Sequence, residues 1–173
     1  NADLVNNIVN LASRTAPLLA RLGGTVDSLS ADDAARFGQL AGALHGVAAD
    51  YEARDYHKVV RFAVNAADVA NQVLQARAPW ALKGADPDAA RVTCTFALQV
   101  FKLVITVLKP VLPGTAAKAE EFLRLGPLSW DDAGRLLPAG HRLREFTRLA
   151  ERLAPEQART LAAPAEACSG TAD

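Results

Sequence analysis

A helical period runs through the stretch Asn1-Ala-Asp-Leu-Val-Asn-Asn-Ile-Val-Asn-Leu-Ala-Ser-Arg14. Polar residues recur at steps of four, three and four, which places one set on a single helix face: Asp3, Asn7, Asn10 and Arg14. The other side takes apolar residues: Leu4, Val5, Ile8, Leu11 and Ala12. This polar stripe holds amides and a guanidinium but neither a nucleophile nor a base. It suits reading hydrogen-bonding edges better than making bonds, and a solvated helix face is the simpler alternative.

Composition favours a single helical domain. The chain has 173 residues, which is one domain by length and enough to bury a real core. Half of the residues are apolar, only 6% are aromatic, and most of the nine prolines lie where helices would stop. No strand-like alternation or internal repeat is present. The prediction is an all-α fold: a helical bundle of about five main helices plus a C-terminal helical segment.

Caps and breakers indicate where the helices begin and end. The first helix should cover about 2–21 and stop at Gly23-Gly24, with Pro17 either kinking it or beginning a separate turn. Asp55 is expected to cap a helix that ends before Pro79. The remaining expected helices span about 31–51 (opened by the N-cap segment 28–33), 87–109 (opened by Asp86-Pro87-Asp88), 115–125, 144–153 and 155–163. The expected organisation is a bundle over 1–125, an irregular segment with packed C-terminal helices over 126–163, and a flexible tail over 164–173.

Charge and cysteine usage limit the function classes. Nineteen basic residues balance nineteen acidic ones, so long-range electrostatic capture of nucleic acid is not indicated. Cys94 and Cys168 lie far apart without a Cys-x-x-Cys motif, which favours reduced thiols, a buried Cys94 and a cytoplasmic protein over a disulfide. The apolar stretch 96–108 is interrupted by Gln99 and Lys102 and is typical of a core helix rather than a membrane span. Because the chain contains no methionine, we expect a fragment of a longer protein.

The residues offer no catalytic or metal-binding set. His45, His57 and His141 are isolated, and neither a phosphate-binding Gly-Lys loop nor Gly-x-Ser-x-Gly occurs. His141 lies in a predicted loop, where a structural hydrogen bond is the favoured role. The adjacent carboxylates are interpreted as solvated or helix-dipole groups rather than acid–base pairs: Asp32-Asp33, Glu120-Glu121 and Asp131-Asp132. The segment by itself is therefore predicted to be non-catalytic.

A second polar stripe precedes Pro79. Amide side chains are only modest helix formers, so a cluster of them in an Ala-rich helix calls for an explanation. The members of the stripe recur near helical spacing: Asn65, Asp68, Asn71 or Gln72, and Gln75. Trp80 follows at once, and a tryptophan at a helix end offers a flat face on which an unstacked base gains about 1–3 kcal/mol. The alternative is a Trp80 that plugs the end of the bundle.

The chain resembles the anticodon-binding domain of methionyl-tRNA synthetases, which are class I aminoacyl-tRNA synthetases. The resemblance runs from Asn1 to about Arg152 and depends on motifs whose order and separation fit together: Asn10-Leu-Ala-Ser-Arg14, Ala67-Asp-Val-Ala-Asn71, Ala78-Pro-Trp80, Leu108-Lys-Pro-Val-Leu-Pro113, Ala119-Glu-Glu-Phe-Leu123 and Trp130. It implies a helical domain that binds the CAU anticodon of initiator and elongator methionine tRNAs.

The resemblance also implies roles for individual residues. Trp80 would stack on the first anticodon base, a cytosine, with Pro79 shaping the turn. Asn10 and Arg14 would hydrogen-bond the edges of unstacked anticodon bases, as proteins usually read RNA loops. The supporting set of the same pocket would be Asn71, Asp68 and Gln75. Gln75 stands where family members often carry an acid, which puts a discriminating role there in doubt.

The implied parent enzyme would attach methionine to its tRNA with ATP and magnesium. Its His-Ile-Gly-His and Lys-Met-Ser-Lys-Ser signatures are absent here and would lie upstream, as would any structural zinc. The expected partners are methionine tRNA and the protein's own catalytic domain, with no DNA and no membrane. Two alternatives stay open: a non-catalytic binding or scaffold protein that kept the bundle, and a paralogous enzyme for another tRNA-dependent reaction.

Overall fold

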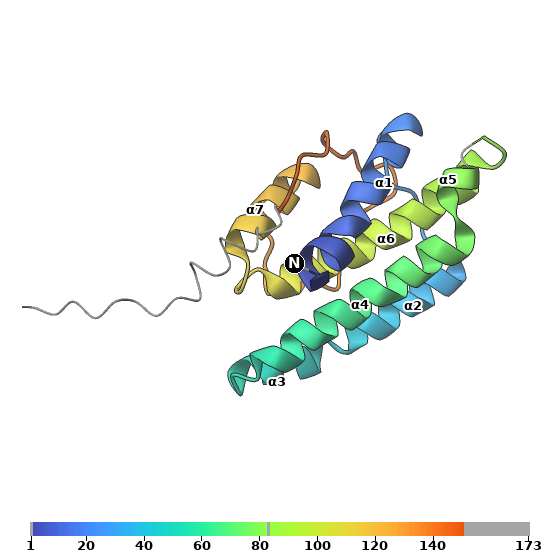
Figure 1. Ribbon diagram of the computed structural model, residues 1–173. Helices are drawn as coiled ribbons and strands as arrows, with labels where there is room; N and C mark the ends of the chain where they lie inside the picture. The colour runs from blue at the N-terminus through green and yellow to red at the C-terminus, as the bar shows by residue number, and fades with distance from the viewer. Residues whose placement is uncertain (1, 83, 151–173) are drawn as a thin grey trace, which may run out of the picture.

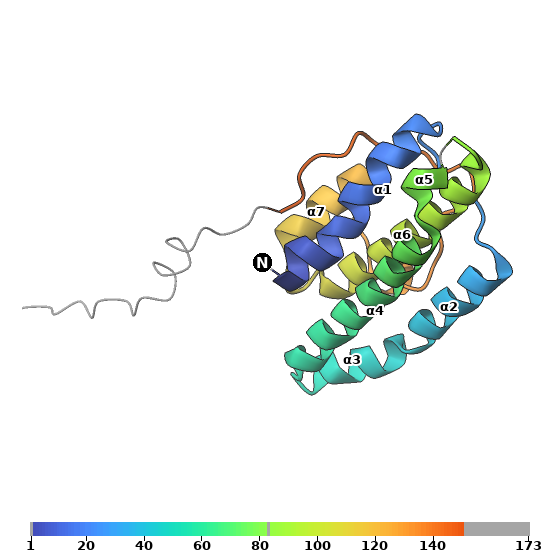
Figure 2. The ribbon, with the colours of Figure 1, turned by 45° about the vertical axis from the view of Figure 1, so that its right-hand side comes forward.

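The computed structural model describes residues 2–82 and 84–150, with side chains from Asn6 onward. The regular elements of the described residues are helices and there is no sheet among them, so the predicted all-α bundle is confirmed; an isolated bridge joins Thr25 and Arg142. Figures 1 and 2 show α6 in the middle of the bundle, with α1 and α4 packed against it. The elements are a π-helix η1 (Ala2–Val9), α1 (Asn10–Arg21), α2 (Ala31–Gly42), α3 (Leu44–Glu52), α4 (Tyr56–Arg77), α5 (Pro79–Leu82), α6 (Pro87–Leu108), α7 (Pro113–Phe122) and a 3₁₀ turn η2 (Trp130–Asp132).

The helix α6 is the core of the protein. Every residue from Thr93 to Leu108 is buried, as the apolar sequence predicts. By length and composition this helix could cross a membrane, but 89% of its apolar window is buried inside the bundle. Asp86 caps it by accepting a hydrogen bond from the backbone N–H of Ala89 at 2.9 Å. Pro87 stands in the first turn, where its missing N–H costs no helical hydrogen bond.

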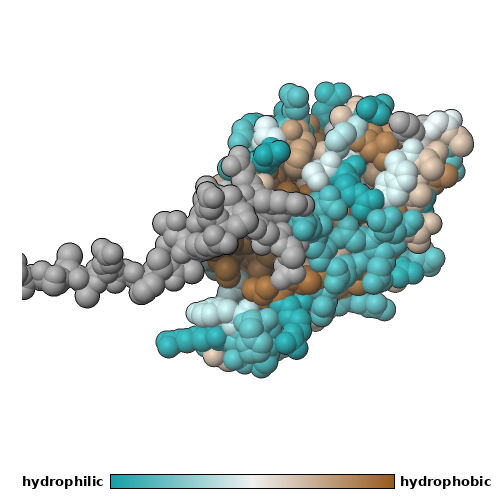
Figure 3. Space-filling model, viewed as in Figure 1, coloured by the Kyte–Doolittle hydropathy of each residue, from teal (hydrophilic) through white to brown (hydrophobic). Residues whose placement is uncertain are grey.

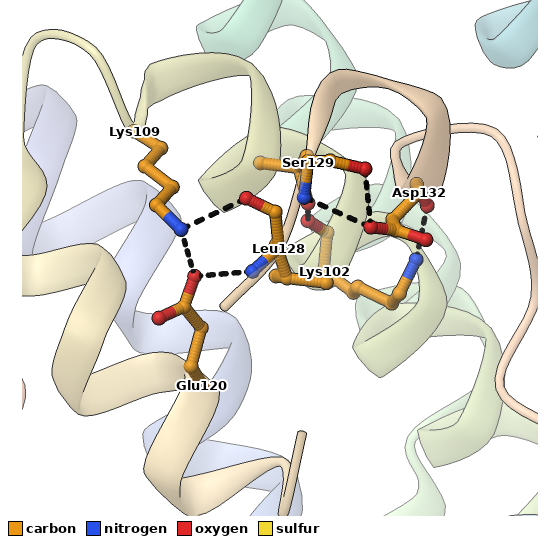
Figure 4. Close-up of polar contacts among 7 residues, drawn as sticks. Lys102, Lys109, Glu120, Leu128, Ser129 and Asp132 are labelled. Carbon is orange, nitrogen blue, oxygen red and sulfur yellow. Dashed lines mark hydrogen bonds and ion pairs between the residues drawn. The ribbon is translucent and has the colours of Figure 1, made fainter. Parts of the chain in front are cut away.

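Two polar residues of α6 hold the irregular segment that follows α7. The Gln99 amide donates to the Leu137 carbonyl at 2.9 Å and accepts from the Leu137 N–H at 2.8 Å. Lys102 donates through Nζ to the carbonyls of Asp132 and Arg135. Figure 4 shows Lys102 reaching η2, where Asp132 in turn accepts from the Ser129 hydroxyl. Gln99 and Lys102, which interrupt the apolar run, therefore supply hydrogen bonds to backbone groups of this segment that would otherwise be buried without partners.

The first helix is continuous but changes its winding. Residues 2–9 form a π-helix and residues 10–21 an α-helix, with Pro17 inside the α-helical part. The expected stop is confirmed: the Gly24 N–H donates to the Leu19 carbonyl at 2.8 Å, and Gly23 and Gly24 have φ of 105° and 71°.

The predictions of one helix over 31–51 and of an Asp55 cap were wrong in detail. The helix expected over 31–51 divides at Ala43 into α2 and α3, in a stretch where Gly42 and Gly46 weaken helix propagation. Asp55 precedes α4 as predicted, but its carboxylate does not cap the backbone. It binds the Lys58 ammonium instead, and this contact lowers the pKa of Asp55. The short helix α5, which carries Trp80, was not anticipated.

The expected helix from about 144 does not form over 144–150. Its backbone and side chains instead bind neighbouring elements: the Arg144 N–H donates to the Phe122 carbonyl at 2.9 Å. The Phe146 ring meets Phe122 edge-on at 5.2 Å, and Leu149 is buried. These tertiary contacts outweigh a weak local helical preference. The preceding helix, expected to reach 125, stops at Phe122 because Arg124 takes a left-handed φ of 55°. The expected helix 155–163 and the tail 164–173 lie outside the described residues.

Cys94 is the buried thiol that the sequence indicates, and burial raises its pKa to about 12 from an ordinary value of 9.0. We expect it to resist thiol reagents in the native protein and to react on unfolding. A Cys168→Ser background would isolate its signal in a labelling time course at neutral pH. Labelling at the rate of the denatured chain would contradict the assigned burial.

The same burial makes stability depend on alkaline pH. Between about pH 9 and pH 12 the folded protein keeps the Cys94 proton that the unfolded chain releases, so this thiol's contribution to stability falls as pH rises. Burial lowers the pKa of Lys102, which acts in the opposite direction. The difference between the wild type and Cys94→Ala in urea melts therefore isolates the thiol, and it should shrink from pH 8 to pH 11.

Candidate nucleic-acid interface

A network of amides joins the two predicted polar stripes. The Asn7 amide donates to the Asp68 carboxylate at 2.8 Å, and the Asn71 amide donates to the Asn7 side-chain oxygen at 2.6 Å. Helical spacing on η1 and on α4 thus brings residues more than sixty positions apart into contact. The Asn71 side-chain oxygen is buried and accepts no hydrogen bond from the described residues. Asn7, which was placed on the stripe but not in the site, proves to be the link between the helices.

Trp80 and Arg14 form one unit. The Arg14 guanidinium carbon lies 4.6 Å from the centroid of the Trp80 ring, a cation–π contact between α1 and α5. Trp80 is 41% exposed, whereas Pro79 beside it is buried. The proline, rather than the tryptophan, is the residue that packs into the end of the bundle. The ring therefore stands at the surface with a positive charge over it.

Asn10 lies on a different surface of α1 from the one where Arg14 meets Trp80. It lines a groove of about 600 Å³ between the first helix and the non-helical segment 143–150. The Ser13 hydroxyl lies 3.4 Å from the Asn10 side-chain oxygen, a weak hydrogen bond within the helix. The groove is lined by Asn6, Val9, Asn10, Ser13, Phe146, Arg148, Leu149 and Ala150. Sequence reasoning missed the partners from 146–150 because it assigned them to a helix.

The supporting residues lie along the outward side of α4. Gln75 shares an open trough of about 550 Å³ with Asp68, Asn71, Gln72 and Ala76. Hydrophilic side chains cover most of this side of α4 in the space-filling view (Figure 3). The structure thus joins Arg14 to Trp80 and Asp68 to Asn71 through Asn7, while Asn10 faces a separate groove. These surfaces offer amide edges, one carboxylate, one guanidinium and one flat aromatic ring.

His141 and Asp132, outside these surfaces, make structural contacts. His141 binds the Leu123 carbonyl through Nε2 at 2.6 Å, as its predicted structural role requires. Asp132 caps η2, and its hydrogen bonds from Ser129 lower its pKa. Among residues 2–82 and 84–150, no cluster of three histidine, cysteine or acidic residues is placed to hold a metal ion.

Two of the carboxylates interpreted as solvated or helix-dipole groups are buried in ion pairs. Asp33 is fully buried against Arg77, at 2.6 Å and 2.8 Å. Glu120 accepts from Lys109 at 2.6 Å and from the Leu128 N–H at 2.7 Å (Figure 4). Residue type and spacing cannot distinguish a solvated carboxylate from one that meets a cation distant in the sequence.

Comparison with known proteins gives a consistent result. A family model described as the anticodon binding domain of methionyl tRNA ligase matches residues 25–165. The methionine–tRNA ligase of Azoarcus sp. (strain BH72) is 38% identical over 164 residues, covering 91% of this chain and 22% of the relative. The methionine–tRNA ligase of Nitrosospira multiformis is 37% identical over 175 residues, covering 91% and 24%. The chain therefore spans less than a quarter of the length of these relatives.

Solved structures agree with the sequence comparison. The free form of Mycobacterium tuberculosis methionyl-tRNA synthetase superposes with a TM-score of 0.82 at 26% identity, covering 90% of this chain and 33% of the other. The same enzyme in complex with methionyl-adenylate gives a TM-score of 0.80, also at 26% identity, covering 88% and 32%. The helical fold, the motifs along it and the match over most of its length place this chain in the family of methionyl-tRNA ligase anticodon-binding domains.

Proposed function

We propose that this chain reads the CAU anticodon of methionine tRNAs on behalf of a parent methionine–tRNA ligase. The observation that carries the proposal is the exposed Trp80 ring with the Arg14 guanidinium 4.6 Å from its centroid. An aromatic face at the surface binds an unstacked base, and an adjacent guanidinium supplies donors toward base edges or phosphate. Both residues belong to motifs on which the resemblance to the family depends, Asn10-Leu-Ala-Ser-Arg14 and Ala78-Pro-Trp80.

Base stacking accounts for recognition by a chain without net charge. A cytosine stacked on Trp80 gains about 1–3 kcal/mol from the ring itself. Arg14 lies close enough to the ring for its guanidinium to donate a hydrogen bond to a base that stacks there. Contacts to bases specify the sequence, whereas contacts to phosphates mainly position the RNA. Neutrality of the whole chain is compatible with this division, since specificity depends on a few local groups.

The remaining polar residues take supporting roles in the proposal. Asn10 would read a second unstacked base from its groove beside Ser13. Asn71 and Asp68 are hydrogen-bonded to Asn7 in the free protein, so a base could bind them only by replacing these hydrogen bonds with its own. Their role is then to hold η1 against α4 and to repel mispaired bases or phosphate through the carboxylate. Gln75 adds an uncharged edge to the same trough.

The parent enzyme is part of the proposal. It would activate methionine with ATP, consistent with a similar synthetase that has been solved with methionyl-adenylate. Magnesium would accompany ATP, and a structural zinc, if the enzyme has one, would belong to the catalytic part. The partners are then methionine tRNA and that catalytic domain, without DNA or membrane, in the cytoplasm. The anticodon contacts would position the tRNA so that its distant acceptor end meets the active site.

Binding of anticodon stem-loops tests the proposal. A CAU loop and a loop with the cytosine replaced should be titrated at moderate salt, with Trp80 fluorescence as the signal in a Trp130→Phe background. Preference for CAU of about tenfold or more, with quenching, supports base-specific reading. Equal binding of the two loops contradicts it and leaves a nonspecific RNA contact. Absence of binding in the full-length ligase as well would favour the scaffold alternative, for which zero net charge is the main support.

Arg14→Ala separates edge reading from phosphate contact. If Arg14 reads a base edge, the variant should lose about 1–3 kcal/mol of affinity for the CAU loop and much less for the substituted loop. Affinity for both loops should be measured across a salt series. A uniform loss with a shallower salt dependence would instead identify Arg14 as a phosphate contact.

A further inference from the structure

A buried ion pair lies directly behind the Trp80 turn. Both carboxylate oxygens of Asp33, in the first turn of α2, accept from the Arg77 guanidinium at 2.6 Å and 2.8 Å. The Asp33 side chain is 0% exposed and that of Arg77 is 34% exposed. Burying a carboxylate carries a desolvation penalty that the pairing often only balances, so such a pair is weak evidence for a stabilising role. Its two-pronged geometry, however, fixes the guanidinium in position and orientation.

The chain next to Arg77 is strained. Arg77 is the last residue of α4, and Ala78 follows with φ 40° and ψ 61°, the left-handed region that an alanine rarely adopts. This conformation is further disfavoured because Ala78 precedes Pro79. Strain of this kind persists only where surrounding contacts hold the backbone. Here the Ala78 N–H donates to the Leu74 carbonyl at 3.0 Å, and its carbonyl accepts from the Ala81 N–H at 2.8 Å.

The direction of the Trp80 ring follows from this turn. Only Ala78 and the buried Pro79 separate Arg77 from Trp80, so a rotation of the α4 end would move the exposed ring. The Arg14 contact is made to the ring itself, two residues beyond the turn at Ala78. Asp33 is the group that ties this end of α4 to α2 through a bidentate contact.

We propose that Asp33 and Arg77 are positioning residues that hold the left-handed turn at Ala78 and thereby set the orientation of Trp80 for base stacking. This inference rests on the proposed function, in which Trp80 is the stacking platform. In this proposal Arg77 acts through Asp33 rather than on RNA, since two of its guanidinium N–H groups donate to that carboxylate. Lysine at position 77 would keep the charge but lose the paired hydrogen bonds.

The test compares Arg77→Lys and Asp33→Asn with a matched control in the Trp130→Phe background. Glu120→Gln is the control, since it weakens another largely buried pair, Lys109–Glu120, between α6 and α7. Three quantities are measured: the melting temperature, the acrylamide quenching of Trp80 in the free protein, and the ratio of affinities for the CAU and cytosine-replaced loops. We expect both pair variants to raise the quenching and reduce the ratio about tenfold. The control should change neither at a comparable loss of stability.

Ala78→Gly provides a second variant that does not break the pair. Glycine adopts the left-handed region without strain, so in this variant the turn no longer depends on the ion pair to hold it. Ala78→Gly alone should keep quenching and loop discrimination near the wild-type values, and added to Arg77→Lys it should restore both, even if Asp33→Asn does not fold.

The outcomes separate the two proposals. Unchanged quenching and discrimination in Arg77→Lys, or no restoration of them when Ala78→Gly is added to Arg77→Lys, would overturn the positioning role. An equal loss of affinity for both loops without a change in quenching would also overturn it, because it would make Arg77 a phosphate contact. A wild type that does not distinguish the loops would overturn the proposed function instead, while the quenching comparison in the free protein would still decide whether the pair orients Trp80.

Discussion

Trp80→Ala is expected to weaken binding of the CAU stem-loop by about 1–3 kcal/mol, roughly 5- to 150-fold, while leaving the helical fold intact. The ring is 41% exposed on the four-residue helix α5, so its removal opens no cavity in the core. The variant also removes the aromatic partner of Arg14, which leaves that guanidinium without a surface to lie on. Affinity should be followed by the anisotropy of a labelled loop, since the tryptophan signal is lost, and the fold by circular dichroism.

Trp130 supplies the control for this experiment. It is similarly exposed, at 36%, but packs edge-on against Tyr51 at 6.0 Å. Trp130→Phe should therefore leave loop affinity unchanged. A Trp80→Ala protein that unfolds without a specific effect on RNA would restore the interpretation of Trp80 as a plug of the bundle.

Phe101→Ala is expected to lower the free energy of unfolding by about 3–5 kcal/mol. Phe101 is 0% exposed in the middle of α6, where α1 and α4 pack on either side, so the lost ring leaves a cavity that the helices cannot close. Folded domains are stable by about 5–15 kcal/mol, so this single change removes a large share of the total. Urea denaturation would measure this loss, provided that the dependence of the unfolding free energy on urea concentration is the same in the variant and the wild type.

Val111→Ala is the matched change at the surface. Val111 is 44% exposed just after α6, and its truncation should alter stability by less than about 0.5 kcal/mol. A loss below about 1 kcal/mol for Phe101→Ala would show that α6 is not the centre of the core. The residual folded fraction of Phe101→Ala should bind the CAU loop with unchanged preference, because Phe101 lies far from the exposed surface.

Local sequence patterns predicted the main helices. The period of apolar residues in α4 and α6 and the breakers at Gly23, Pro79 and Asp86-Pro87 depend on neighbours in the chain, so they can be recognised without tertiary information. The polar stripes were recognised for the same reason, since residues three and four apart share a helix face. The residue types of Arg14 and Trp80, with their family motifs, sufficed to nominate them.

What the stripes do depended on packing. Asn7 bridges to Asp68 and Asn71, and Arg14 meets Trp80, because the first helix and α4 both pack against α6 and against each other. The segment 144–150 is not helical because Phe122 offers it a backbone carbonyl and a ring contact in place of its own preceding turn.

The sequence alone was therefore enough to predict an all-α fold, the main helix boundaries and membership of a family of anticodon-binding domains. Only the tertiary structure decided that Asp33 is buried against Arg77, that Ala78 is strained, and that Pro79 packs inward while Trp80 faces outward. The physical reason is the separation along the sequence of the residues that interact. Helix period and capping depend on residues within about one turn of each other. Burial, ion pairing and backbone strain depend on which distant segments the core brings together.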